Sequence, residues 1–140
     1  MFQKLIIVGN IGKDPEARFT PQGNQVTTFS VAVNRKYSGR EGQKVEEVTW
    51  FRVQAWNKLG EICKQYLSVG KQVLVEGRLV VDGKTGGPRM WTDPEGNPRA
   101  AFEIFAETVR FLGRRTEDGE NRNDEAAGTT PAAVQEEIPF

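Results

Sequence analysis

The side chains best suited to chemistry lie in one short stretch of the 140-residue chain, Val48–Trp56. The side chains of a β-strand alternate between its two faces. If this stretch is a strand, one of its faces is apolar and the other mixes aromatic, basic and polar side chains. The first face carries Phe51, Val53 and Ala55, and the second carries Trp50, Arg52, Gln54 and Trp56. Burying the mixed face would leave a guanidinium and an amide without partners, at a cost of several kcal/mol. We therefore predict that the apolar face packs into a core and that both indoles lie on the solvent side, where large exposed rings usually have a ligand or partner.

Two more aromatic residues, Tyr37 and Trp91, lie in polar hairpins beside basic side chains. The basic neighbours are Arg35, Lys36, Arg40 and Lys44 for the first, and Lys84, Arg89 and Arg99 for the second. Flat rings beside cations suit stacked nucleobases and tracked phosphates, and stacking contributes roughly 1–3 kcal/mol per base whatever its identity. The pattern indicates binding of single-stranded nucleic acid. The alternative is that the tryptophans cap a barrel or form a protein–protein interface.

The composition excludes several kinds of catalytic site. There is no histidine and Cys63 is the only cysteine, so neither a Cys/His zinc site nor a Ser-His or Cys-His nucleophile pair can form within the chain. Cys63 lies on the apolar face of a predicted helix, and we expect it in the core. Gly83-Lys84-Thr85 lacks the upstream Gly of a phosphate-binding loop, and Asp82, Asp93 and Glu95 are typical of turns. We expect no metal, no cofactor and no enzymatic activity.

Extended patterns dominate residues 1–113. The predicted strands are Phe2–Val8, Glu16–Phe19, Val26–Val33, Val45–Trp56, Gln72–Val81 and Ala101–Phe111. Gly9–Gly12 is predicted to break the first strand, and Arg35–Gln43 to form a hairpin loop.

One helical pattern interrupts these strands. Within Asn57–Gly70, the apolar spacing of Leu59, Ile62, Cys63 and Tyr66 marks one helix face. Asn57 is expected as the N-cap and Gly70 as the residue after the C-cap. A helix between the third and fourth barrel strands predicts an all-β fold with one helix, namely a five-stranded Greek-key barrel of the OB type.

Charge and hydropathy divide the chain into a body and a tail. Residues 1–113 carry 16 Lys/Arg against 12 Asp/Glu, a net charge of +4, whereas residues 114–140 carry 3 against 7, a net charge of −4. From Thr116 to Ala133 there is no aromatic, Leu, Ile, Val or Met side chain, and such a segment cannot offset the entropy of ordering it. We predict an OB-fold domain at 1–113, a disordered acidic linker at 114–134 and a tip at 135–140.

The tip ends in Glu136-Glu137-Ile138-Pro139-Phe140. Two interpretations stay open: a random terminal composition, or a short linear motif whose Ile138 and Phe140 fill a partner's pocket while the acids meet basic residues. The chain has no run of 18 apolar residues. We expect no secretory signal, because Gly9 ends the first apolar stretch and no small-residue cleavage site follows it. Together with a single thiol, this favours the cytoplasm.

Several strings of residues resemble the bacterial single-stranded DNA-binding protein family. They cover Leu5–Gly113 and recur at the tip: Ile7–Phe19, Thr49–Val53, Asn57–Glu61, Tyr66-Leu67 with Gly70–Val73, Val75–Leu79, Trp91–Asp93 and Ile138–Phe140. The resemblance implies a homotetramer of OB-folds that binds and protects single-stranded DNA without sequence preference. It implies that the tip recruits replication, recombination and repair proteins, that the protein is associated with the nucleoid, and that subunits pair near Phe2–Val8.

The resemblance also assigns residue roles. Base-stacking positions fall on Tyr37, Trp50, Trp56 and Trp91. Positions that contact the DNA backbone fall at or near Arg18, Arg52, Lys58 and Arg78, and Arg35 joins them as a cation beside Tyr37. Partner docking falls on Glu136, Glu137, Ile138, Pro139 and Phe140. The chain departs from the family in having only two acids in the tip, and in Asp82, where some relatives have basic residues.

Three other functions fit parts of the pattern. An OB-fold with stacking rings also suits RNA, as in a cold-shock-like chaperone, because stacking alone does not separate RNA from DNA. A Trp-rich face also suits an assembly scaffold that binds protein. A nuclease fits least, since no motif supplies a convincing metal site.

Overall fold

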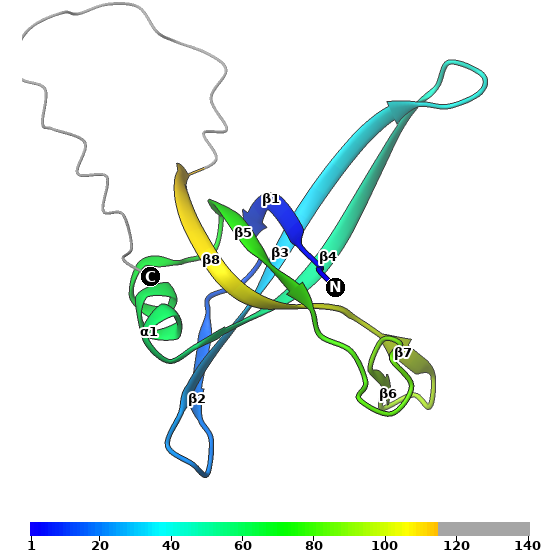
Figure 1. Ribbon diagram of the computed structural model, residues 1–140. Helices are drawn as coiled ribbons and strands as arrows, with labels where there is room; N and C mark the ends of the chain where they lie inside the picture. Colours follow the sequence, from blue (N-terminus) through cyan, green and yellow to red (C-terminus); the bar gives the residue numbers. More distant parts are fainter. Residues whose placement is uncertain (115–140) are drawn as a thin grey trace, which may run out of the picture.

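The computed structural model describes residues 1–114, and the expected linker and tip, from residue 115 onward, lie outside the described residues (Figure 1). Eight strands and one helix follow one another in the described part. They are β1 (Leu5–Ile11), β2 (Glu16–Phe19), β3 (Gln25–Ser38), β4 (Lys44–Trp56), α1 (Asn57–Tyr66), β5 (Lys71–Leu79), β6 (Met90–Thr92), β7 (Pro98–Ala100) and β8 (Phe102–Arg114). No helix among these residues has the length and apolar character needed to cross a membrane.

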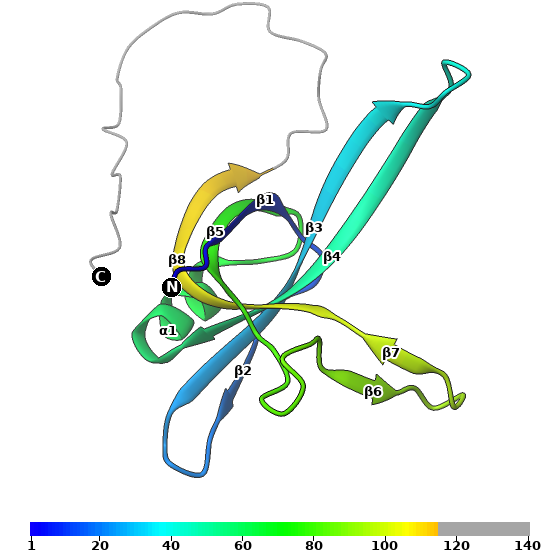
Figure 2. The ribbon, with the colours of Figure 1, turned by 45° about the vertical axis from the view of Figure 1, so that its right-hand side comes forward.

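Five of the strands close into a barrel. The sheet runs in the order β1-β5-β8-β4-β3, and β1 closes it by pairing with β3. β4 and β8 are parallel, whereas the other barrel neighbours are antiparallel. β2 pairs with β3, and β6 and β7 form a separate hairpin that projects from the barrel (Figure 2). The predicted five-stranded barrel, with its helix between the third and fourth barrel strands, is confirmed.

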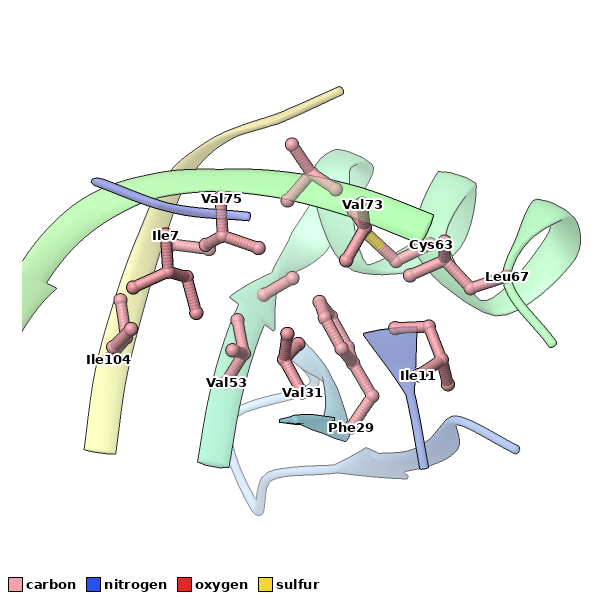
Figure 3. Close-up of a cluster of buried hydrophobic side chains, with 13 residues drawn as sticks. Ile7, Ile11, Phe29, Val31, Val53, Cys63, Leu67, Val73, Val75 and Ile104 are labelled. Carbon is pink, nitrogen blue, oxygen red and sulfur yellow. The ribbon is translucent and has the colours of Figure 1, made fainter. Parts of the chain in front are cut away.

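The core fills the barrel with the inward side chains of these strands and one face of α1 (Figure 3). The predicted division of β4 is confirmed, because Val53 and Ala55 are fully buried. β1 alternates in the same way, with Ile7 and Ile11 buried and Ile6 exposed. The buried set is Ile7, Ile11, Phe29, Val31, Val53, Ala55, Cys63, Leu67, Val73, Val75, Ile104, Ala106 and Val109.

The expected break at Gly9–Gly12 is wrong, because β1 continues through Gly9 and Asn10 to Ile11. Gly9 is needed there for a close approach: a Cβ at residue 9 would lie 2.2 Å from the carbonyl oxygen of Ala32 on β3. Asn10 and Ile11 then pair with Ala32 and Val31. The glycine thus serves the closure of the barrel, which is one of the roles that glycine has inside strands.

The expected hairpin loop at Arg35–Gln43 is also wrong over its first half. β3 runs to Ser38 and β4 begins at Lys44, so only residues 39–43 form the turn. The two strands form a long ribbon that extends away from the barrel (Figure 1). The cross-strand partners include Arg35 with Glu47 and Lys36 with Glu46. Opposite charges placed directly across from one another stabilise such a pair, which explains how a polar segment stays extended.

The helix is shorter than the pattern predicted, and both of its expected caps are wrong. Trp56 is the N-cap without any side-chain cap bond, and Asn57 has a positive φ of 52°. Leu67 is the C-cap, and its N–H donates to the carbonyl of Cys63. Gly70 lies farther on, where its N–H donates to the carbonyl of Ile11. Cys63 lies in the core as expected, and burial raises the pKa of its thiol to about 12.

Gly60 lets the helix pack directly on the barrel. A Cβ there would lie 2.5 Å from the carbonyl oxygen of Ala55 and 3.1 Å from Oγ1 of Thr27, which donates to the carbonyl of Gly60 at 2.7 Å. We predict that Gly60→Ala lowers the free energy of unfolding by about 1–3 kcal/mol, because the backbone of β4 cannot yield to the added methyl. Urea denaturation measures this change.

The control is Gly83→Ala, in a loop where an added Cβ meets no atom within 4 Å. Its stability should stay within about 0.5 kcal/mol of the unmodified chain. In an unconstrained helix, Gly→Ala would instead stabilise by roughly 0.5–1 kcal/mol, so a stabilised Gly60→Ala variant would refute the close packing.

Candidate nucleic-acid interface

Trp50 lies on the outer face of β4 and is 54% exposed. Its partner across the strand pair is Ala32 on β3, a small residue that leaves the surface beside the indole open. The six-membered end of the ring reaches Gly12, where an added Cβ would lie 2.3 Å from Cζ3 and 2.7 Å from Cη2. The absence of a side chain at residue 12 therefore gives the indole its place on the sheet.

Trp56 lies on the same outer face and is half-buried. Its ring stacks on Phe105 of β8, with ring centroids 6.3 Å apart and an interplanar angle of 23°. The guanidinium of Arg78 on β5 lies 4.6 Å from the centroid of Phe105. Three neighbouring strands thus present an indole, a phenyl ring and a cation in a row, which we call the aromatic row. The indole Nε1 of Trp56 is buried and has no hydrogen-bond partner among the described residues.

The sequence pattern did not lead us to predict Phe105 as a site residue, although its position in the strand offered a signal. Its neighbours Ile104 and Ala106 are buried, so Phe105 lies on the opposite face of β8, together with Glu103 and Glu107. An aromatic residue between two acids on the polar face of a strand is the same anomaly that drew attention to Trp50.

Three of the expected cations surround this face. Arg52 is exposed and lies opposite Ser30 of β3. Arg18 of β2 is aligned with Val26, and Val26 is aligned with Trp56. Arg18 therefore lies at the end of the aromatic row beyond Trp56. Lys58 is exposed at the start of α1. Within residues 1–113, none of Arg18, Arg52 and Lys58 forms an ion pair with another described residue.

Tyr37 does not share a face with Trp50. In the β3–β4 ribbon Tyr37 is aligned with Val45. An odd number of residues along each strand separates this pair from Ala32 and Trp50, so the two pairs lie on opposite faces. The Tyr37 hydroxyl donates to Glu47 Oε1 at 3.1 Å, and this hydrogen bond raises the pKa of Tyr37. Arg35 lies 5.2 Å from the ring centroid and 4.0 Å from Glu47 Oε2. The ribbon tip also has an open groove of about 460 Å³ lined by Lys36, Tyr37, Ser38, Lys44, Val45 and Glu46.

Trp91 is 49% exposed on β6, but its expected basic neighbours are largely paired. Arg89 contacts Glu103 through two hydrogen bonds, and Arg99 Nε lies 2.9 Å from Asp93 Oδ2. Hydrogen bonds from the Asn97 backbone and from Arg99 lower the pKa of Asp93. The two arginines that the sequence places near Trp91 are therefore each paired with a carboxylate.

The acids of this region form turns. Asp82 Oδ1 accepts from the backbone N–H groups of Lys84 and Thr85, and Asp93 Oδ1 accepts from those of Glu95 and Asn97. No group of three or more His, Cys, Asp or Glu side chains among residues 1–113 has an arrangement that could hold a metal ion.

A known protein family matches most of the chain. The sequence pattern of the single-strand binding protein family matches residues 2–112. The chain belongs to this family.

The curated relatives carry corresponding names. A single-stranded DNA-binding protein of Neisseria meningitidis is 37% identical over 115 residues, which are 82% of this chain and 62% of the relative. A single-stranded DNA-binding protein of Deinococcus radiodurans is 38% identical over 93% of this chain and 40% of the relative. Single-stranded DNA-binding protein 1 of Chlorobaculum tepidum is 34% identical over 97% of this chain and 75% of the relative. The chain thus spans less than two thirds of the length of several relatives that it matches.

Two solved structures share the fold. The small single-stranded DNA-binding protein of Streptomyces coelicolor has a TM-score of 0.64 and 27% identity, over 79% of this chain and 95% of that one. The Plasmodium falciparum SSB in complex with ssDNA has a TM-score of 0.66 and 24% identity, over 80% of this chain and 96% of that one.

The contact between Gly12 and Trp50 leads to a prediction about the position of the ring. Gly12→Ala should push the Trp50 indole off the sheet and shift its emission to longer wavelength, because the ring enters water. The added methyl meets the end of a flexible side chain, so stability should change by only about 0.5 kcal/mol. Fluorescence of a chain that also carries Trp56→Phe and Trp91→Phe isolates the Trp50 signal, and an unchanged spectrum would contradict the contact.

Proposed function

We propose that this protein binds single-stranded DNA without sequence preference, as a non-enzymatic protein that protects exposed strands. The observation that carries the proposal is the outer face of β4. There the half-exposed Trp50 indole lies next to the exposed Arg52, which forms no ion pair within residues 1–113. A ring offers its flat face to any base, and a guanidinium meets the phosphates, so neither group reads sequence.

The proposed contacts follow the surfaces described above. Trp50, Trp56, Trp91 and Tyr37 stack on bases, and Phe105 extends the platform beneath Trp56. Arg18, Arg35, Arg52, Lys58 and Arg78 neutralise phosphates. The names of the relatives and the complex of the Plasmodium protein with ssDNA support this choice of ligand.

We further propose that the protein is a homotetramer. β1 pairs with β5 from Leu5 to Asn10, but in the described part of the chain it pairs with β3 only at Asn10 and Ile11. The other edge of Leu5–Gly9 is therefore open to a second copy, and an open edge readily pairs with another strand. The outward side chains Ile6 and Val8 are 56% and 43% exposed, which supports an apolar contact between subunits.

The proposal extends to residues 114–140, of which 115–140 lie outside the described part. Residues 1–113 form the DNA-binding domain, residues 114–134 a disordered acidic linker, and residues 135–140 a docking tip. The tip places Ile138 and Phe140 in an apolar pocket of replication, recombination and repair proteins, while Glu136 and Glu137 meet basic residues there. We also propose that the protein acts in the cytoplasm, associated with the nucleoid, because its proposed ligand is DNA.

Removing either indole should weaken DNA binding more than it changes stability. Trp50→Ala and Trp56→Ala are each expected to reduce affinity for oligo-dT by about 5- to 150-fold, equivalent to losing roughly 1–3 kcal/mol of stacking. The measurement is fluorescence titration with oligo-dT of several lengths at two salt concentrations, with the mass of the complex determined in parallel. Affinity should fall steeply with salt.

Phe102→Ala is the matched control. Phe102 is an aromatic residue that is 59% exposed, but it lies on the core-facing side of β8 and not on the outer face. It should leave affinity nearly unchanged. If both tryptophan variants bind like the unmodified chain, stacking on this face is refuted. Competition between RNA and DNA oligomers of matched sequence tests the alternative ligand, and salt-insensitive or absent binding favours a protein scaffold.

Deleting Ile138–Phe140 should separate the two proposed activities. Affinity for oligo-dT is expected to stay the same or rise slightly, since an acidic tail competes with DNA for basic groups. Binding to replication and repair proteins should be lost, as measured by pull-down with the full chain as control. A loss of DNA affinity upon this deletion would contradict the proposed division of labour.

A further inference from the structure

Trp91 lies in a segment, residues 82–99, that leaves the barrel after β5 and returns to it at β8. We call this segment the excursion. β6 and β7 pair only with each other among the described strands, and they project to one side (Figure 2). The turns at either end are satisfied internally: Asp82 exchanges backbone hydrogen bonds with Gly86 and Gly87, and Asp93 with Gly96 and Asn97. These hydrogen bonds shape the excursion itself, but they do not determine its direction relative to the barrel.

An ion pair joins the base of this excursion to the barrel wall. Arg89, immediately before β6, donates from Nε to Glu103 Oε2 at 2.6 Å and from Nη2 to Glu103 Oε1 at 2.8 Å. Glu103 lies on β8, is only 5% exposed, and is aligned with Arg52 on β4. A two-point contact between a guanidinium and a carboxylate constrains orientation as well as distance.

Glu103 is an unusual residue to find buried unless it has such a partner, because an unpaired buried carboxylate is strongly unfavourable. The other side-chain hydrogen bonds of residues 82–99 stay within the excursion. The Arg89–Glu103 pair therefore joins the hairpin to the strand beside the proposed binding face.

We propose that Arg89 and Glu103 are positioning residues, whose ion pair holds the β6–β7 hairpin on the barrel so that Trp91 has a fixed place relative to Trp50 and Arg52. This inference rests on the proposed function. It assigns to Arg89 a role other than phosphate contact, and it gives an acidic residue a positive role in binding an anion.

That role leads to a test based on the sign of the effect. Glu103→Gln removes a negative charge near the proposed DNA path, so electrostatics alone would strengthen binding to oligo-dT. Loss of the ion pair instead predicts binding weakened by about five- to tenfold, because Trp91 loses its fixed place. The matched control is Glu95→Gln, which removes the same charge from an exposed side chain in the hairpin's own turn, and it should leave binding unchanged or tighter. A Glu103→Gln variant that binds as tightly as Glu95→Gln overturns the proposal.

Arg89 variants give a second, independent readout, at a side chain that is 47% exposed. A lysine keeps the charge but cannot form the two-point contact. The proposal expects Arg89→Lys and Arg89→Gln to weaken binding alike, with no change in the slope of log K against log[salt]. If Arg89→Lys binds like the unmodified chain while Arg89→Gln lowers the slope by about one, Arg89 contacts phosphate and the proposal fails.

The anisotropy of Trp91 fluorescence without DNA separates this proposal from the proposed function. In a chain that also carries Trp50→Phe and Trp56→Phe, Trp91 is the remaining tryptophan. Arg89→Lys and Glu103→Gln should each lower its anisotropy in that chain, because the hairpin then moves more freely relative to the barrel. Unchanged anisotropy in a folded variant overturns the positioning role. Failure of the unmodified chain to bind oligo-dT would refute the proposed function instead, and the anisotropy would still test the ion pair.

Discussion

The alternation of β4 between core and solvent is the constraint on which the rest of the structure depends. Val53 and Ala55 are fully buried between β3 and β8. A shift of one residue would turn every side chain of the strand to the opposite face. It would bury the guanidinium of Arg52 and remove the contribution of roughly 1.5–3 kcal/mol that a buried Val makes. Core packing therefore holds Trp50 and Trp56 outward without any contribution from a ligand.

The outer face divides the aromatic residues into two classes. Trp50 and Trp56 rest on the barrel itself, where Gly12 gives one ring its space and Phe105 supports the other. Tyr37 and Trp91 lie on hairpins that extend from the barrel (Figure 2). Rings held on a packed sheet lose little freedom when a ligand arrives, which favours affinity. Rings on extensions can follow a flexible strand over a longer path, provided that the base of each extension is held.

Local patterns were sufficient to predict part of the barrel core. Period-two alternation identified Val53 and Ala55, and the spacing of the apolar helix residues placed Cys63 in the core. Failures occurred where the deciding partner is distant in the sequence. Gly9 reads as a strand breaker until Ala32 is seen to pass beside it. Arg89 reads as a basic neighbour of Trp91 until Glu103 is found to pair with it, because no local pattern records a partner that another strand supplies.

The ion pairs also explain how a chain of zero net charge can have cations available on its surface. Two acids of the body are occupied by structural cations: Asp93 by Arg99, and Glu103 by Arg89. A phosphate that displaced one of these arginines would leave a carboxylate without its partner, most unfavourably at buried Glu103. In contrast, Arg18, Arg52 and Lys58 form no ion pair with another described residue, so a phosphate can pair with them without breaking one. The pairing of charges within the fold, rather than their total, therefore determines which cations are available to a polyanion.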